Sequence, residues 1–513
     1  MAQKASLADN LIKDIESVKS PVVGGQSGEI IELYDGVAVV EGLPNARYGE
    51  MATLGNNHVG MITDLKEFQV AVLLFDDYTQ LRVGDRVTIN GTILSIPVSE
   101  KLLGRVVNPL GAPIDGQGAL PTKEREEIEK IAPGIVHRKQ VSVPLQTGIK
   151  SIDGLIPIGR GQRELIIGDR STGKTTIAID TILNQKHEQV ICVYVAIGQK
   201  ESKVAQVVNL LSEAGAMAYT IVVNASANDP GSLQYIAPYA GSAIAEYFMN
   251  KGKDVLIIYD DLTKHAWAYR QISLILRRPA GREAYPGDVF YLHSRLLERS
   301  CRLSPEKGGG SITALPIIET QEGDIAAYIP TNVISITDGQ IFLEKDLFNA
   351  GMRPAINVGA SVSRVGSSAQ VKAMKQVAGQ LKLELAQYRE LAAFSQFASE
   401  LDEETKKTLD RGARMYELLK QGKNKPLTLS EQVVTMWFGV RGYTKDIPVT
   451  AISQFEAEAL EYVKAKHFAL LEVIAKEKIV SEKIETELHK IAKKFITYFF
   501  VKRHEPSAAK EKN

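Results

Sequence analysis

The sequence carries Gly168-Asp169-Arg170-Ser171-Thr172-Gly173-Lys174-Thr175, a full match to the phosphate-binding pattern G-x-x-x-x-G-K-[ST]. Its glycines let the backbone curl, so that consecutive N–H groups point at phosphate oxygens beside the positive end of a helix. Lys174 supplies a positive charge for the β- and γ-phosphates, and the hydroxyl of Thr175 is a ligand for Mg²⁺. We therefore expect this P-loop, together with Thr176, to bind a nucleoside triphosphate.

The neighbours of the loop test whether the match is real, because the pattern also occurs by chance. An apolar strand, Leu165-Ile166-Ile167, leads into the loop. Apolar residues at helical spacing then follow it, at Ile177, Ala178, Ile179, Ile182 and Leu183. A strand, a loop and a helix in this order are the setting that the motif requires.

An acidic pair, Asp260-Asp261, follows the apolar run Val255-Leu256-Ile257-Ile258-Tyr259. Alone, two acids after a strand are more often part of a solvated loop. In a chain with a P-loop, a carboxylate at the end of a strand completes the magnesium shell. We expect Asp260, the first acid after the run, to hold Mg²⁺ through a water molecule.

Turn signals and apolar runs divide the rest of the chain. Residues 26–97 contain short strands, with hairpin turns expected at Asp35-Gly36 and Asn90-Gly91, and they predict a small closed β-barrel. Residues 98–371 contain apolar runs such as 190–195 and 220–223, which alternate with helical segments. This alternation predicts an α/β nucleotide-binding domain with buried parallel strands.

Helical patterns occupy both ends of the chain. In residues 372–504 the expected helices include one that continues from Val371 and two at 454–474 and 482–500. The apolar positions of the helix that continues from Val371 are Val371, Met374, Val377, Ala378 and Leu381. Residues 1–25 predict a short amphipathic helix that rests on its own domain or holds a partner, and residues 505–513 form a polar tail.

Composition argues against several classes of function. Lys and Arg together number 61, as do Asp and Glu, so no overall positive field favours nucleic acid. The two cysteines, Cys192 and Cys301, form no CxxC pair, which argues against metal or redox sites and indicates a reducing compartment. The longest apolar runs are far shorter than a membrane span, and the first residues do not form a signal pattern.

Several further motifs resemble those of the alpha subunits of rotary ATP synthases. They are Ile158-Gly159-Arg160-Gly161-Gln162-Arg163-Glu164-Leu165, Tyr269-Arg270-Gln271-Ile272-Ser273, Arg277-Arg278-Pro279, Phe290-Tyr291-Leu292-His293-Ser294-Arg295 and Pro354-Ala355-Ile356-Asn357-Val358-Gly359-Ala360-Ser361-Val362-Ser363. The resemblance covers nearly the whole chain. It implies a β-barrel, a RecA-like nucleotide-binding domain and a helical bundle.

The resemblance also implies partners and a location. Three alpha and three beta subunits would alternate around a gamma central stalk, with the N-terminal helix reaching the delta subunit or peripheral stalk. The assembly would couple proton or sodium movement to ATP synthesis. The chain would lie on the cytoplasmic face of a bacterial inner membrane, bound to it only through the complex.

The resemblance places particular residues in this chain's own nucleotide site. Gln199 stands where the catalytic beta relatives carry a glutamate that activates water, so this site is expected to bind Mg-ATP or ADP without hydrolysing it. Phe348, Arg353 and Gln421 are expected around the base and ribose, with Arg170 in the loop, although Phe348 also fits a core position and Gln421 a solvated one.

One residue is expected to act elsewhere. The resemblance makes Arg364 an arginine finger that acts on the adjacent beta site, because a guanidinium stays charged and matches phosphate geometry. Two residues depart from the common alpha pattern. Ser171 and Lys423 each replace a glutamine, which leaves nucleotide affinity and base selectivity open.

Two other functions remain open. A self-sufficient hexameric ATPase, such as an export or flagellar ATPase or a Rho-like helicase, would share the P-loop but needs a carboxylate near Gln199. A purely structural ring member would have lost its nucleotide site, which the intact Gly173, Lys174, Thr175 and Asp260 disfavour. The beta subunit itself is disfavoured by Gln199.

Overall fold

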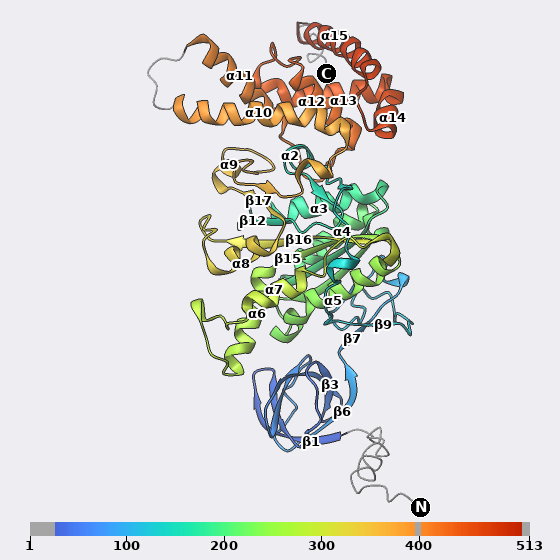
Figure 1. The fold of residues 1–513 in the computed structure, drawn as a ribbon, viewed down its shortest axis with the longest axis vertical. Helices are drawn as coiled ribbons and strands as arrows, with labels where there is room; N and C mark the ends of the chain where they lie inside the picture. Colours follow the sequence, from blue (N-terminus) through green and yellow to red (C-terminus); the bar gives the residue numbers. More distant parts are fainter. Residues whose placement is uncertain (1–25, 396–401, 505–513) are drawn as a thin grey trace, which may run out of the picture. The chain divides into compact units, whose positions relative to one another are not determined.

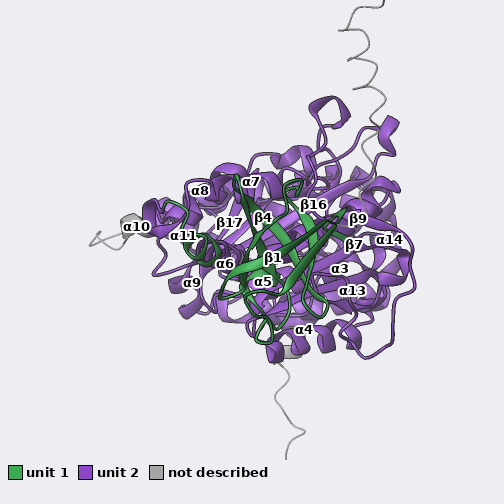
Figure 2. Cartoon of the chain, turned by 90° about the horizontal axis from the view of Figure 1, so that it is seen from below, with its two compact units in different colours: residues 1–95, 230–233, 271–279 green, residues 96–229, 234–270, 280–513 purple. Residues whose placement is uncertain are grey.

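The structure is a computed structural model that describes residues 26–395 and 402–504 (Figure 1). The expected N-terminal helix at 1–25 and the polar tail at 505–513 lie outside these residues. Two compact units divide the chain, as Figure 2 shows. The described part of the first consists of residues 26–95, 230–233 and 271–279, and the second contains the remaining described residues.

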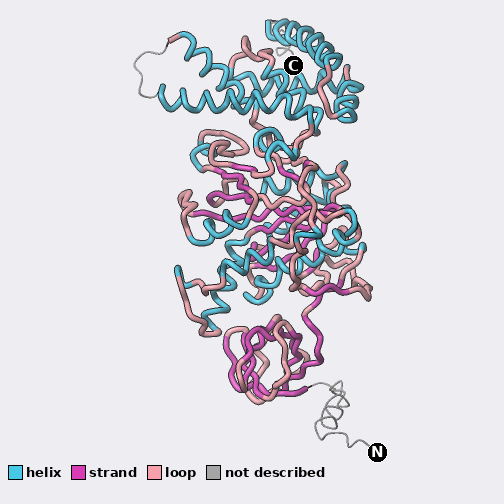
Figure 3. Tube along the Cα trace, in the orientation of Figure 1, coloured by secondary structure: helices cyan, strands magenta, loops and turns pink. Residues whose placement is uncertain are grey.

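The first unit contains a closed six-stranded barrel, as predicted (Figure 3). Its strands pair in the order β1-β2-β5-β4-β3-β6, and all of these pairs are antiparallel. They are β1 (Gln26–Tyr34), β2 (Val37–Glu41), β3 (Glu50–Leu54), β4 (His58–Leu65), β5 (Gln69–Leu74) and β6 (Arg86–Ile93). Ile30, Leu54 and Val72 are fully buried in its core.

One of the two predicted hairpin turns is wrong. Asp35-Gly36 does join β1 to β2, where Tyr34 pairs with Val37. Asn90-Gly91, in contrast, lies inside the single strand β6. Gly91 has a φ of 79°, and the pairing of β6 with β3 shifts there. The pair therefore forms a bulge, because a bulge needs a left-handed glycine as much as a tight turn does.

The second unit contains an eight-stranded sheet in the order β18-β17-β12-β16-β15-β13-β14-β8. Every pair is parallel except β17 with β18. The strands are β8 (Val106–Val107), β12 (Leu165–Asp169), β13 (Ile191–Gln199), β14 (Thr220–Ser226), β15 (Asp254–Asp260), β16 (Ser311–Thr320), β17 (Gly339–Leu343) and β18 (Val362–Ser363). The chain leaves β12 for β13, then returns through β15 and β16 to the side of β12. Ligands of open α/β sheets bind at such a reversal, beyond the carboxyl ends of the strands.

Helices connect these strands and form the last part of the chain. Those within the sheet region are α2 (Lys150–Leu155), α3 (Lys174–Asn184), α4 (Glu201–Glu213), α5 (Gly231–Asn250), α6 (Leu262–Ile275), α7 (Val289–Leu297), α8 (Tyr328–Ile336) and α9 (Lys345–Asn349). Those that follow are α10 (Lys372–Ser395), α11 (Glu403–Leu418), α12 (Leu429–Val440), α13 (Ile452–Lys466), α14 (Phe468–Glu477) and α15 (Glu482–His504). In the described residues, none of the helices combines the length and the apolar character needed to cross a bilayer.

Four of the five periodic apolar positions predicted for this helix are buried in α10: Met374, Val377, Ala378 and Leu381 are each at most 2% exposed. Val371 lies just before α10 and is partly buried. The stretch at 454–474, in contrast, is two helices. His467, with a φ of −136° and a ψ of 33°, separates α13 from α14 because it leaves the helical conformation.

A buried ion pair joins α5 to the chain that follows α7. The guanidinium of Arg299 donates through Nε and Nη2 to the two carboxylate oxygens of Glu246, at 2.7 and 2.8 Å. Its Nη1 donates to the carbonyl oxygen of Ile128 at 2.6 Å. Both side chains are almost wholly excluded from solvent, so each charge depends on the other.

We expect Glu246→Gln to lower the free energy of unfolding by about 3–5 kcal/mol, because it leaves the Arg299 charge buried without a counter-charge. The double variant Arg299→Met/Glu246→Leu should recover most of that loss. Urea unfolding followed by circular dichroism measures both, with Glu403→Gln in the exposed Lys407–Glu403 pair as the control. A single variant as stable as the wild type would contradict this account.

Candidate nucleotide-binding site

The P-loop joins the end of β12 to the start of α3. Gly173 has a φ of 102°, in the left-handed region that favours glycine. A Cβ on Gly168 would lie 2.5 Å from the carbonyl oxygen of Leu343 in β17. Both glycines are therefore needed, the first for its backbone angle and the second for the close approach of two strands.

Lys174 begins α3 and points back into the loop. Its Nζ donates to the carbonyl oxygens of Gly168 and Asp169, at 2.7 and 2.6 Å, and lies 3.9 Å from the Glu319 carboxylate. Burial lowers the pKa of Lys174, while Glu319, Asp261 and Asp260 act to raise it. The ammonium group thus stands where phosphate oxygens would replace the two carbonyl partners.

The carboxylate of Asp260, at the end of β15, accepts hydrogen bonds from several polar side chains. Its Oδ2 accepts hydrogen bonds from the hydroxyls of Thr175 and Tyr194, both at 2.8 Å. A hydroxyl and a carboxylate oxygen at this separation suit Mg²⁺, which prefers hard oxygen ligands and retains several waters. The described residues contain no group of three or more His, Cys, Asp or Glu side chains that could hold a metal alone, so phosphate and water would complete the shell.

Gln199 ends β13 and is 5% exposed. Its Nε2 donates to the backbone oxygen and Oδ1 of Asp260, at 3.1 and 2.9 Å, and to Asp261 at 3.3 Å. Its Oε1 accepts from Lys203 Nζ at 3.1 Å. Both ends of the amide are therefore held by hydrogen bonds, and neither end can take up a proton as a base at neutral pH.

Two cavities flank the P-loop. The phosphate-side cavity, of about 560 Å³, is lined by Arg170, Ser171, Gly173, Lys174, Thr175, Thr176, Gly198, Gln199, Lys200, Lys203, Ala227, Asp260, Asp261, Lys264, Trp267 and Glu319. The base-side cavity, of about 260 Å³, is lined by Ile149, Ser171, Thr172, Gly173, Thr176, Ile177, Asp180, Phe348, Arg353, Pro354, Ala355, Gln421 and Lys423. Because Ser171, Gly173 and Thr176 line both, one ligand could span them.

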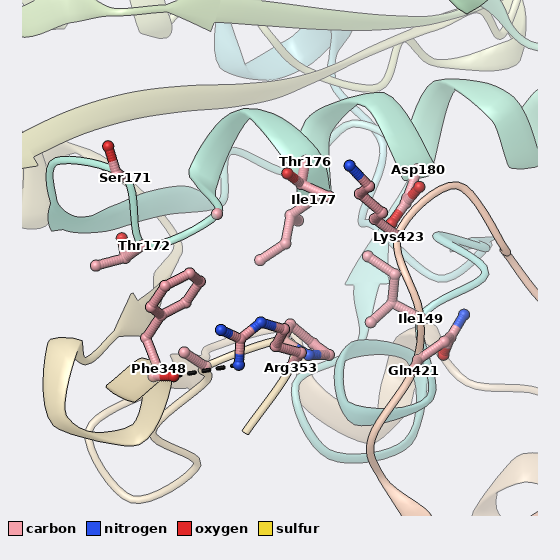
Figure 4. A pocket seen from close by; sticks show the side chains of 13 residues that line it. Ile149, Ser171, Thr172, Thr176, Ile177, Asp180, Phe348, Arg353, Gln421 and Lys423 are labelled. Carbon is pink, nitrogen blue, oxygen red and sulfur yellow. Dashed lines mark hydrogen bonds between the residues drawn. The ribbon is translucent and has the colours of Figure 1, made fainter. Parts of the chain in front are cut away.

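The base-side cavity brings the three residues expected around the base together with the loop (Figure 4). The guanidinium of Arg353 lies over the Phe348 ring, 4.1 Å from its centroid, and donates to the Phe348 carbonyl oxygen at 3.2 Å. The two side chains form one wall, and α3 forms the wall opposite. Phe348 is thus a cavity residue and not part of the core.

Gln421 lines the cavity, but its amide is engaged by the backbone. Its Oε1 accepts from the N–H of Lys150 at 3.1 Å. Its Nε2 donates to the carbonyl oxygens of Gly148 and Lys425, at 2.7 and 2.8 Å. Gln421 therefore holds the segment after α11 against the start of α2. Because both ends of its amide are engaged, it would contact a base by packing and not by hydrogen bonds.

The other predicted residues are dispersed. Arg170 lines only the phosphate-side cavity. Asp169 lines neither cavity, because its carboxylate accepts from the Thr320 hydroxyl and the Gly323 N–H, at 2.7 and 2.8 Å. Arg364 is exposed after β18, away from both cavities, and its backbone N–H donates to the Asp338 carbonyl oxygen at 2.8 Å.

Sequence reasoning missed Asp180 and Lys203. Asp180 lies four residues after Thr176 on α3, so helical spacing places both on the side that faces the base-side cavity. Lys203 lies four residues after Gln199 and reaches Asp260 at 3.5 Å. In both cases the sequence signal was a separation of four residues from a residue already assigned to the site, Thr176 or Gln199.

Asp180 should make stability depend on pH. Burial raises its pKa from 3.8 to about 6, although the Asn424 N–H acts to lower it. Since the folded chain holds this proton more tightly than the unfolded chain, stability falls as pH rises from 3.8 to 6. We expect Asp180→Asn to remove about 3 kcal/mol of that fall, measured by urea unfolding at several pH values. A pH dependence identical to that of the wild type would contradict it.

Comparison with known proteins covers all three regions. Models of the ATP synthase alpha/beta family match the beta-barrel domain at residues 24–91, the nucleotide-binding domain at 148–363 and the C-terminal domain at 370–495. ATP synthase subunit alpha of Sulfurovum sp. (strain NBC37-1) is 55% identical, over 97% of this chain and 99% of the relative. The subunit alpha of Clostridium kluyveri is 56% identical, over 95% of this chain and 97% of the relative. The subunit alpha of Clostridium botulinum (strain Eklund 17B) is 58% identical, over 93% of this chain and 94% of the relative. This chain belongs to the ATP synthase alpha/beta family, among its alpha subunits.

Proposed function

We propose that this chain holds Mg-ATP or Mg-ADP without hydrolysing it and lends Arg364 to a catalytic site on a neighbouring beta subunit. The observation that carries the first half is the amide of Gln199, fixed between Asp260 and Lys203 at the wall of the phosphate-side cavity. General-base catalysis contributes about 10²–10⁴ in rate, and an amide cannot supply it.

The chain's own residues hold the nucleotide. The N–H groups at the start of α3 and the ammonium of Lys174 bind the phosphates, while the Phe348 and Arg353 wall receives the base. Thr175 directly and Asp260 through a water molecule would hold magnesium, which neutralises phosphate charge when bound. Residues 26–97, 98–371 and 372–504 are proposed as the barrel, nucleotide-binding and helical domains.

The exposure of Arg364, away from the two cavities that flank the P-loop, supports a role in trans. We propose an alternating ring of three such chains and three beta subunits around a gamma stalk. The N-terminal helix would contact the delta subunit or peripheral stalk. The assembly would move protons or sodium ions and lie on the cytoplasmic face of a bacterial inner membrane.

A second function, independent ATP hydrolysis, is favoured by one carboxylate. Glu319 lines the phosphate-side cavity, and its side chain is 33% exposed. It could serve as a base if it released Lys174, which lies 3.9 Å away. In the first function the Gln199 amide keeps hydrolysis negligible, whereas in the second the Glu319 carboxylate would drive it.

We expect Gln199→Glu to raise ATP hydrolysis by the isolated chain by about 10²-fold, whereas Gln199→Leu leaves it at the wild-type level. Beside Asp260 and Asp261, a new carboxylate would hold its proton more tightly, which suits a base at neutral pH. Phosphate release with saturating Mg-ATP measures the rate. Rapid wild-type hydrolysis that Glu319→Gln abolishes would establish the second function instead.

We expect Arg364→Ala to lower ATPase activity of the reconstituted ring by about 10³–10⁵, because an arginine finger stabilises charge in the transition state. Nucleotide bound to this chain should remain at wild-type levels, as measured after gel filtration. Lys407→Gln, an exposed charge on α11, is the control. Near-normal turnover of the Arg364→Ala ring would refute the role in trans.

A further inference from the structure

The ammonium of Lys203 lies beside the two oxygens that the proposed function assigns to magnesium. Its Nζ is 3.3 Å from Oγ1 of Thr175 and 3.5 Å from Oδ2 of Asp260. It also donates to Oε1 of Gln199 at 3.1 Å. Because the Thr175 hydroxyl donates to Asp260 at 2.8 Å, the two oxygens are close enough for one cation to contact both.

Each of the three carboxylates that line the phosphate-side cavity has a lysine beside it. The pairs are Lys264 with Asp261 at 3.1 Å, Lys174 with Glu319 at 3.9 Å and Lys203 with Asp260 at 3.5 Å. The Asp260 side chain is only 3% exposed, and a buried carboxylate needs a cation close to it. Lys203 is therefore the counter-charge of the carboxylate at the magnesium position.

Helix stability does not account for a lysine at this position. α4 begins at Glu201, so Lys203 is in its first turn, where the helix dipole favours negative side chains and disfavours positive ones. The side chain is 42% exposed, yet its ammonium points to the buried ends of β13 and β15. The flexible four-carbon stem of a lysine also allows the group to withdraw into solvent when another cation takes its partners.

We propose that the ammonium of Lys203 and Mg²⁺ are alternative cations at one position, so that this chain retains ATP with or without the metal. The two cations cannot contact the same oxygens together, because their repulsion grows as the distance between them falls. Without magnesium, Lys174 and Lys203 supply the positive charge for the phosphates from the lining of one cavity. With magnesium, Lys203 moves away and leaves Thr175 and Asp260 to the metal and its water. The inference rests on the proposed function, since it concerns nucleotide held at that site.

Equilibrium dialysis of the full-length chain against labelled ATP tests the proposal, in excess Mg²⁺ or in EDTA at the same ionic strength. The ratio of the two dissociation constants measures how strongly the site depends on the metal. We expect the wild type to bind ATP at most about tenfold more weakly in EDTA. Lys203→Met keeps an apolar stem without the charge, and it should raise the ratio by about tenfold or more, because metal-free ATP loses a charge-assisted contact. In Mg²⁺ the variant should bind ATP at least as tightly as the wild type.

Lys200→Met is the matched control, because Lys200 is an exposed lysine that lines the same cavity. Loss of a general electrostatic attraction weakens binding equally with and without the metal, so this variant should keep the wild-type ratio. Wild-type chain that binds ATP in Mg²⁺ and loses it in EDTA would overturn the inference alone. An unchanged ratio in Lys203→Met, including equal weakening in both conditions, would also overturn it. Wild-type chain that binds no ATP even in Mg²⁺ would overturn the proposed function together with this inference.

Discussion

The close contact of the P-loop with the strand beside it constrains the whole nucleotide-binding region. Gly168 approaches the Leu343 carbonyl oxygen so closely that no side chain fits, and this fixes β12 between β16 and β17. The loop can then turn sharply into α3, with Lys174 at the first position of the helix. Because α9 and Phe348 follow β17 directly, the same packing brings the base-side wall to the loop.

Asp260 has a comparable role on the phosphate side. Thr175, Tyr194 and Gln199 all donate to its carboxylate, and Lys203 lies close to it. These contacts unite the ends of β13 and β15 with the start of α3. They also immobilise the Gln199 amide. Under the proposed function, the residues that would hold magnesium therefore also fix an amide, and not a base, beside the phosphates.

The sequence alone predicted most of the architecture, because local signals and burial agree there. The buried parallel strands follow from continuous apolar runs, the closed barrel from short strands with turn signals, and the apolar stripe of α10 from a period of 3.6 residues. The hairpin turn predicted at Asn90-Gly91 was wrong because a left-handed glycine suits a bulge and a hairpin equally. The choice depends on β3, where Glu50 accepts from the Gly91 N–H at 2.5 Å. The amide of Gln421 and the position of Asp180 likewise depend on segments more than a hundred residues away, which no local pattern specifies.

The central claim is that this site binds ATP and cannot cleave it. A single-turnover experiment tests it most directly: γ-labelled ATP is bound to the isolated chain with magnesium, free nucleotide is removed, and the bound label is followed over hours. The account predicts that the retained nucleotide stays ATP until it dissociates, and that Lys174→Ala retains none. Conversion of the bound ATP to ADP and phosphate before dissociation would contradict it.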